Sequence, residues 1–265
     1  MSTIQETEAG VDTPRRFKSK VVIVTGGGTG MGLAVAERVA AEGGTVLIAS
    51  RRKDVAATAV AAITAKGGKA AHVPTDVTVE ADVERLVSVA VTEYGGLHGA
   101  FNNAGGMSAF GPVHQIDDQA WHAEIALGLT SVFYGVKHQI PAIEASGGGA
   151  IVNNASNLGV VGMGTVGPYV AAKHGVVGLT KAAALETAER GVRINAALPG
   201  GVDTPLFGST TGATAEGRET VRSLHPLGRI ARPEEIAATV CHLLSEEASF
   251  VTGAALSLDG GFTAQ

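Results

Sequence analysis

Short apolar segments rich in β-branched residues recur along the chain from Lys20 onward. They occupy residues 21–25, 45–49, 70–73, 99–102, 150–153, 192–197 and 254–258. Apolar side chains at helical spacing, such as Val83, Leu86 and Val87, lie between the first six segments. The pattern predicts seven strands that alternate with helices as far as the sixth strand.

Strands that are apolar on both faces and separated by helices form a parallel sheet that is covered on both sides. We therefore expect an α/β fold over residues 19–265, a single doubly wound Rossmann-type domain with a seven-stranded parallel sheet flanked by helices. Residues 1–18 are polar and aperiodic, which is typical of a flexible extension. Residues 203–229 break the alternation with glycines and threonines, and we expect them to form a mobile substrate flap.

The composition narrows the class of protein. Hydrophobic residues make up 45% and charged residues 17% of the 265 positions, a balance that excludes a mainly disordered chain. The net charge of −5 argues against nucleic acid or an anionic membrane as a partner. The chain has neither an apolar run long enough for a membrane span nor a cationic leader, so we expect a cytoplasmic protein.

The cysteine and the histidines indicate neither a disulfide nor a metal site. The one cysteine, Cys241, excludes an internal disulfide and lies at helical spacing with Ile236, Val240 and Leu244, as a core residue would. The eight histidines form no ligand motif, so we expect no metal site.

Residues 25–32, TGGGTGMG, follow the first strand directly and open the first helix. Glycines let the backbone approach a pyrophosphate, and the N-terminus of the helix favours the anion. The alternative is a glycine-rich turn without a ligand, but the strand–turn–helix context favours a dinucleotide site. The residues expected to touch the cofactor here are Gly26, Thr29, Gly30, Met31 and Gly32.

The end of the second strand should show which cofactor is used, because an acidic residue there would bind the ribose 2′-hydroxyl. This chain has Ser50, Arg51 and Arg52 at that point. A guanidinium binds a 2′-phosphate by charge-assisted hydrogen bonds, so we expect NADP(H) rather than NAD(H). The alternative is that the arginines only solvate a helix start. Asp76, after the third strand, either accepts from the adenine amino group or caps the next turn.

Tyr169 and Lys173 are four residues apart on a segment that begins after Gly167 and Pro168, a favourable start for a helix. This spacing puts both on one helical face. A lysine on an alanine-rich apolar helix is expensive to bury without a use. Its positive charge would lower the pKa of the phenol, which would make Tyr169 a general acid and base.

From about Lys20 to its end, the chain resembles the short-chain dehydrogenase/reductases. The matching segments are the glycine turn at 25–32, the Asn-Asn-Ala-Gly turn at 102–105, Ser156 thirteen residues before Tyr169, the Tyr169-x-x-x-Lys173 pair, and the Pro-Gly-Gly-Val-Asp-Thr run at 199–204. The order and number of these motifs make the resemblance specific.

The resemblance implies a role for each matched residue. Tyr169 exchanges a proton with the substrate oxygen, Ser156 hydrogen-bonds that oxygen, and Lys173 binds the nicotinamide ribose and lowers the pKa of Tyr169. Hydride passes between the nicotinamide and the substrate carbon, without a metal. The resemblance also implies a homotetramer with contacts through the long helices and the C-terminal strand. The remaining residues expected at the cofactor are Val77, Asn103, Ala104, Gly105, Pro199, Gly200, Val202 and Thr204.

One position departs from the family pattern. Relatives carry an asparagine seven residues after a tryptophan that matches Trp121, and it helps hold a water that links the active-site lysine to solvent. Here that position is Gly128. Two interpretations remain open: drift with a water in the vacated space, or a slowed or rerouted proton relay.

The apolar residues that flank the motifs predict an uncharged ketone or secondary alcohol as substrate. Several segments are similar to those of relatives that act on cyclic diols and diketones. One alternative is 3-oxoacyl-thioester reduction, with Arg218, Arg222 and Arg229 at the pocket mouth. Another is a cofactor-binding sensor without catalysis. The expected pocket wall is Gly106, Met107, Leu158, Val160, Val161, Met163, Leu206 and Phe207.

Overall fold

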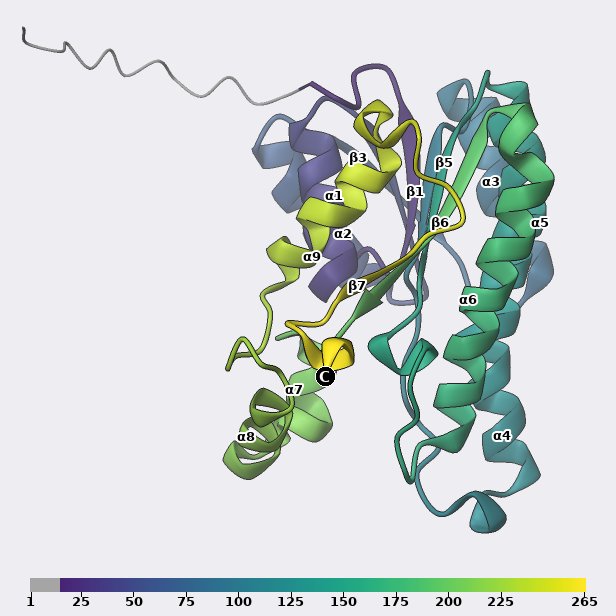
Figure 1. Cartoon of the computed structure of the whole chain (residues 1–265). Helices are drawn as coiled ribbons and strands as arrows, with labels where there is room; N and C mark the ends of the chain where they lie inside the picture. Colours follow the sequence, from purple (N-terminus) through teal and green to yellow (C-terminus); the bar gives the residue numbers. More distant parts are fainter. Residues whose placement is uncertain (1–14) are drawn as a thin grey trace, which may run out of the picture.

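The computed structural model describes residues 15–265 and has one seven-stranded parallel sheet between two layers of helices (Figure 1). The strands are β1 (Val21–Thr25), β2 (Thr45–Ser50), β3 (Lys69–Pro74), β4 (Gly99–Asn102), β5 (Gly149–Asn154), β6 (Val192–Pro199) and β7 (Ala255–Leu258). All seven predicted strands are present, and their ends differ from the expected ones by at most two residues. The expected Rossmann-type architecture is confirmed.

The strand order is β3-β2-β1-β4-β5-β6-β7, and every neighbouring pair is parallel. The chain therefore runs outward from β1 to β3 and then returns to place β4 on the other side of β1. In open parallel sheets, ligands bind outside the carboxyl ends of the strands where the order reverses. That point here is the pair β1 and β4.

The helices divide between the two faces of the sheet. Their bounds are α1 (Gly30–Ala41), α2 (Lys53–Ala65), α3 (Glu80–Tyr94), α4 (Asp118–Ile125), α5 (Ser131–Ala145), α6 (Gly167–Thr187), α7 (Pro205–Ser209), α8 (Ala215–Ser223) and α9 (Pro233–Leu244). Helices α1, α2 and α9 cover one face, and α3, α5 and α6 cover the other (Figure 1). None of the helices within residues 15–265 is long and apolar enough to cross a lipid bilayer.

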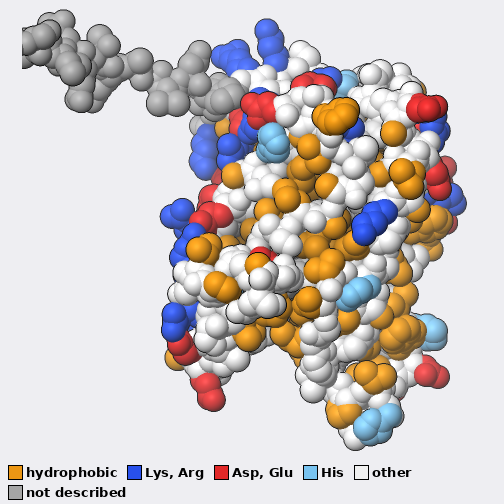
Figure 2. All heavy atoms as spheres, in the orientation of Figure 1, with side chains coloured by type: hydrophobic (Ala, Val, Ile, Leu, Met, Phe, Trp, Pro, Cys, Tyr) orange, Lys and Arg blue, Asp and Glu red, His pale blue; other side chains and the backbone are white. Residues whose placement is uncertain are grey.

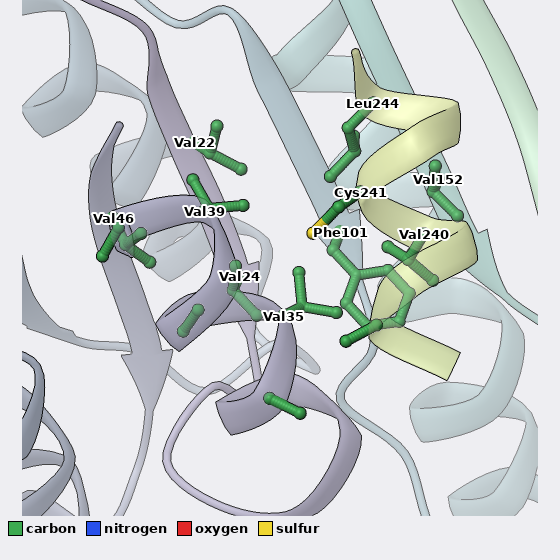
Figure 3. Close-up of a cluster of buried hydrophobic side chains, with 14 of the residues drawn as sticks. Val22, Val24, Val35, Val39, Val46, Phe101, Val152, Val240, Cys241 and Leu244 are labelled. Atoms are coloured by element: carbon green, nitrogen blue, oxygen red, sulfur yellow. The ribbon is translucent and has the colours of Figure 1, made fainter. Parts of the chain in front are cut away.

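Alternate residues of each strand face alternate cores. Val22 and Val24 pack with Phe101 and Val240 in the core beneath α1 and α9 (Figure 3). Ile23 packs in the opposite core. Cys241 belongs to the first core and is fully buried, as expected, and burial raises the pKa of its thiol to about 12.

The domain begins earlier than the sequence indicated. Residues 1–14 of the expected extension lie outside the described residues, but Arg16 and Phe17 pack on the domain, while Arg15 and Lys18 are exposed. Phe17 is 2% exposed, and Arg16 pairs with Glu42 at 2.6 Å and with Glu247 at 2.7 Å. A single buried aromatic side chain in a polar stretch has no periodic signal, so the pattern could not show it.

The segment expected to be a flap, residues 203–229, forms α7, one turn of 3-10 helix and α8. It lies below the sheet in Figure 1, opposite the segment that carries α4. The space-filling view shows a notch between these two parts of the molecule (Figure 2). The notch opens at the end of the sheet to which the carboxyl ends of the strands point.

Candidate active site

The glycine turn between β1 and α1 has the form that a pyrophosphate requires. Gly26 and Gly30 have φ angles of 65° and 55°, which L side chains rarely adopt. A Cβ on Gly32 would lie 2.4 Å from the carbonyl oxygen of Gly26. Thr29, the N-cap of α1, makes no side-chain cap, and the first turn contains no acidic residue. The free N–H groups at this helix start therefore fit an anion.

The turn after β4 is tied to β1 by Thr25. Its hydroxyl accepts hydrogen bonds from the backbone N–H groups of Asn103 at 2.8 Å and Ala104 at 2.9 Å. The Asn103 side chain in turn donates to the Thr25 carbonyl at 2.9 Å. Thr25 belongs to the predicted glycine motif, but the sequence predicts no role for its side chain. This side chain joins the turns at residues 26–32 and 102–105 across the point where the strand order reverses.

The end of β2 carries no acidic residue. The Ser50 hydroxyl donates to the Arg52 carbonyl at 3.3 Å. Arg51 is 73% exposed and lies 3.7 Å from Asp76. Asp76 accepts from the backbone N–H of Thr78 at 3.0 Å and its hydroxyl at 2.7 Å, and these contacts hold the pKa of Asp76 below its usual value. Asp76 thus caps the next turn, one of its two expected roles, and buried Val77 follows it.

Tyr169 and Lys173 lie together on α6, which begins at Gly167 with Pro168 in its first turn, as expected. The Lys173 ammonium is 5.5 Å from the centre of the Tyr169 ring. Lys173 is only 4% exposed and donates to the Asn154 carbonyl at 2.8 Å. The cation is therefore held between α6 and the end of β5, against the phenol.

Ser156 completes the predicted group from the turn after β5. It is 6% exposed, and its hydroxyl accepts from the Leu158 N–H and donates to the Asn157 side chain, each at 3.1 Å. Asn154 binds Lys173 through its carbonyl and donates through its side chain to Asn103 at 3.2 Å. Asn154 was missed in the sequence analysis. It connects the Lys173 ammonium group to the turn after β4.

Burial changes the pKa values of the pair in a direction that was not expected. It raises the pKa of Tyr169 above its ordinary value, and the Ser156 hydroxyl only partly opposes this. Burial also lowers the pKa of Lys173 to about 8. The expected lowering of the Tyr169 pKa is therefore not found in the chain itself, where loss of hydration has the largest effect on this pKa.

The end of β6 brings the expected run at 199–204 to the same edge. The Gly201 N–H donates to Nε2 of His225 at 2.9 Å, while Nδ1 of His225 donates to the Val221 carbonyl at 2.6 Å. The Thr204 hydroxyl caps α7 by accepting from Phe207 N–H at 3.2 Å. The contacts of buried His225 were not predicted from the sequence. It links the β6 turn to α8.

The expected substrate wall is largely open. Leu158 is buried, whereas Val160, Met163 and Leu206 are 44%, 40% and 50% exposed. Gly106, Met107, Val161 and Phe207 are half-buried. A cavity of about 280 Å³ lies elsewhere, between the β6 turn and the C-terminal residues, and none of the expected wall residues lines it. The residues of the predicted wall, apart from Leu158, are thus exposed or half-buried and lie outside that cavity.

Gly128 lies in a π-helical turn, Ala126–Thr130, between α4 and α5. A Cβ at this position would meet the Cβ of Ala172 at 3.0 Å and Oε1 of Glu124 at 3.9 Å. Glu124 is 1% exposed, and its negative charge raises the pKa of both Tyr169 and Lys173. Sequence reasoning missed Glu124, because nothing in its local pattern shows that an α4 carboxylate is buried beside α6.

No group of three or more His, Cys, Asp or Glu side chains within residues 15–265 could hold a metal ion. What the edge of the sheet offers instead is the glycine turn beside half-buried Tyr169, buried Ser156 and buried Lys173.

Known proteins share this arrangement. A family model described as "Enoyl-(Acyl carrier protein) reductase" matches residues 26–263. The chain is 43% identical to cyclohexanol dehydrogenase of Acinetobacter sp. (strain SE19) over 94% of its own length and 97% of that protein. It is also 43% identical to a 2,5-dichloro-2,5-cyclohexadiene-1,4-diol dehydrogenase of Sphingobium indicum, over 94% and 98% of the two chains.

A solved structure agrees with these relatives. The fold matches the crystal structure of levodione reductase with a TM-score of 0.91 and 35% identity, over 94% of this chain and 99% of that one. The motifs, the sheet order and the similarity along the whole domain lead to one conclusion: the chain is an oxidoreductase that belongs to the short-chain dehydrogenase/reductase family.

Proposed function

We propose that the chain transfers hydride between NADP(H) and an uncharged cyclic ketone or secondary alcohol, without a metal ion. The observation that carries this proposal is the pair of half-buried Tyr169 and buried Lys173 beside Ser156, at the edge of the sheet where the glycine turn lies. When bound, the nicotinamide supplies or accepts the hydride. The chain's own residues exchange a proton with the substrate oxygen and stabilise the charge on it.

In this proposal Tyr169 donates a proton to the oxygen during reduction and accepts one during oxidation. Ser156 donates a hydrogen bond to the same oxygen and stabilises the charge that grows on it. Lys173 keeps positive charge next to the phenol, held by the Asn154 carbonyl at 2.8 Å. Residues 26–32 and Asn103 to Gly105 would hold the cofactor, and Pro199 to Thr204 would lie against the nicotinamide.

Two observations favour a cyclic alcohol or ketone over an acyl thioester. The relatives at 42 and 43% identity include cyclohexanol dehydrogenase and a cis-4-hydroxycyclohexanecarboxylate dehydrogenase, each named for a ring alcohol. The arginines that an acyl thioester would need are already paired: Arg218 with Asp203 at 2.8 Å, Arg222 with Glu219 at 2.6 Å, and Arg229 with Glu235 at 2.7 Å. Cations neutralised in this way attract a phosphate weakly.

A comparison of substrates tests the proposal. We expect faster turnover of cyclohexanone and cyclohexanol than of an acetoacetyl thioester, followed by the absorbance of the reduced nicotinamide. Faster reduction of the thioester would favour the acyl-reductase alternative. Tight cofactor binding with no turnover of either substrate at several pH values would favour a sensor.

The preference for NADP(H) rests on the end of β2. Ser50 does not repel a 2′-phosphate and Arg52 is exposed. Arg51 is 73% exposed and its contact with Asp76 is long, at 3.7 Å, so its guanidinium can turn toward a phosphate. We expect kcat/KM with NADP to exceed that with NAD, and Ser50→Asp to reverse the order. Lys181→Ala removes an exposed cation from α6 and should leave the ratio unchanged. A higher kcat/KM with NAD in the natural chain would contradict the preference.

Assembly as a homotetramer is part of the proposal. Leu185 on α6 and Phe250 next to β7 are 85% and 103% exposed, and Leu256 lies on the edge strand β7 itself. Large apolar side chains gathered on such faces are typical of contacts between copies. Sedimentation analysis of the protein and of Phe250→Ser, expected to dissociate, tests this point.

A further inference from the structure

Glu124 is a buried carboxylate that the proposed chemistry does not use. Its Oε2 accepts hydrogen bonds from the backbone N–H of Ser108 at 2.8 Å and from the Ser108 hydroxyl at 2.9 Å, with the Ala109 N–H at 3.4 Å. These donors belong to the loop that follows the cofactor turn of β4. One oxygen of the carboxylate therefore fixes the loop that carries Gly106 and Met107 of the expected substrate wall.

The other oxygen, Oε1, is buried and has no hydrogen-bond partner among the described residues. A buried acceptor without a donor is unfavourable, and its presence in a native fold calls for an explanation. A Cβ on Gly128 would lie 3.9 Å from Oε1 and 3.0 Å from the Cβ of Ala172. Oε1 thus stands where α4 meets α6, next to the residue that precedes Lys173.

Few titratable side chains surround the Glu124 carboxylate. Helix α6 contributes Tyr169 and Lys173, and Glu124 is the one charge that acts on both. The loop at residues 103–111 and the π-helical turn at 126–130 contain no titratable side chain. Because the site is buried, solvent screens the attraction between the carboxylate and the ammonium group poorly.

We propose that Glu124 is a positioning residue: its carboxylate is the counter-charge of Lys173, and it sets the pH range in which the Tyr169–Lys173 pair works. Gly128 leaves room for this arrangement, because a Cβ there would press on Ala172 at 3.0 Å and would touch Oε1 at 3.9 Å. The inference rests on the proposed function for its kinetic test and on the structure alone for its spectroscopic test.

The sign of the effect follows from the charge. A negative group favours the protonated forms of both Tyr169 and Lys173, so it raises both pKa values. Reduction needs the protonated phenol and is lost as the pH rises through the pKa of the pair. Removing the charge should therefore move the alkaline fall of the reduction rate to lower pH.

Glu124→Gln is the informative variant, because the amide keeps an oxygen for Ser108 but removes the charge. We expect the alkaline limb of kcat/KM for ketone reduction to move down by about one pH unit, with KM nearly unchanged. Glu124→Asp keeps the charge and should keep the natural pH profile. Glu144→Gln, which breaks the 2.8 Å pair with Arg190 at the far end of α5, is the matched control and should not move the profile.

A second readout needs neither substrate nor cofactor. The chain has three tyrosines, so ultraviolet titration of tyrosinate in a Tyr94→Phe, Tyr134→Phe background reports Tyr169 alone. We expect its midpoint to fall by about one pH unit in Glu124→Gln. A lower rate without any shift of profile or midpoint would mean a merely structural role and would overturn the inference. A shifted midpoint in a protein that turns over no carbonyl would refute the proposed function but not this role.

Discussion

On the cofactor side of the sheet edge, buried side chains tie the backbone together. The Thr25 hydroxyl holds two N–H groups, and Asn154 joins Lys173 to Asn103. On the substrate side, α7 and α8 lie at the surface, where Arg218 pairs with Asp203 at 2.8 Å and stacks on Phe207 at 5.2 Å.

The two kinds of contact differ in strength. A buried donor left unpaired costs about 1–3 kcal/mol, whereas an exposed ion pair contributes about 0–1 kcal/mol. The contacts of the cofactor side are therefore costly to break, whereas the exposed ion pairs of α7 and α8 are cheap to break. We expect the strand ends to set the reaction type and the short surface helices to set substrate choice.

Lys173→Met should have the largest effect, and it should change activity and stability in opposite directions. We expect kcat to fall by about 10³-fold, because the phenol loses its neighbouring charge. At the same time the protein should become more stable, by up to about 3 kcal/mol at neutral pH, because a buried charge is removed. Turnover assays and urea unfolding measure the two quantities.

The gain in stability should depend on pH. Burial lowers the pKa of Lys173 from 10.5 to about 8, so between these values the unfolded chain binds the extra proton and the natural protein gains stability as the pH rises. The advantage of Lys173→Met should therefore be greatest below pH 8 and should shrink toward pH 10.5. An advantage that is constant from pH 7 to pH 10.5 would contradict the assigned cause.

Thr25→Val tests the cofactor side alone. It leaves the N–H groups of Asn103 and Ala104 without their acceptor, so we expect a loss of about 1–3 kcal/mol in unfolding free energy and weaker NADPH binding. Thr214→Val removes the same hydroxyl from the exposed cap of α8, 3.0 Å from Gly217 N–H, and should cost less than about 1 kcal/mol. Equal losses of unfolding free energy in the two variants would contradict the difference in strength between the contacts of the two sides.

Arg218→Ala tests the substrate side and should have the smallest effect. It removes the contacts of α8 with Asp203 and Phe207, so we expect KM for the alcohol to change a few-fold while NADPH affinity and stability stay nearly the same. Arg222→Ala removes an equal charge from the same helix but contacts neither residue. If Arg218→Ala instead weakened NADPH binding and left KM unchanged, the flap would belong to the cofactor side.

The parts that could be predicted from sequence are those with a local signal. Strands buried on both faces read as short apolar runs, the glycine turn has a strand before it and a helix after it, and a spacing of four placed Tyr169 and Lys173 together. The roles of Glu124, Asn154 and His225 depend on contacts between elements far apart in the chain, which no local pattern records. The pKa of Tyr169 is raised, whereas the sequence predicted a lowered value, because loss of hydration depends on packing rather than on spacing.

The most direct test of the account is Tyr169→Phe assayed with cyclohexanol and NADP. Because the phenol is the proposed acid and base, the account predicts that kcat falls by at least about 100-fold while NADPH affinity and the melting temperature are retained. Oxidation of cyclohexanol by the phenylalanine variant at a rate close to that of the natural protein would contradict it.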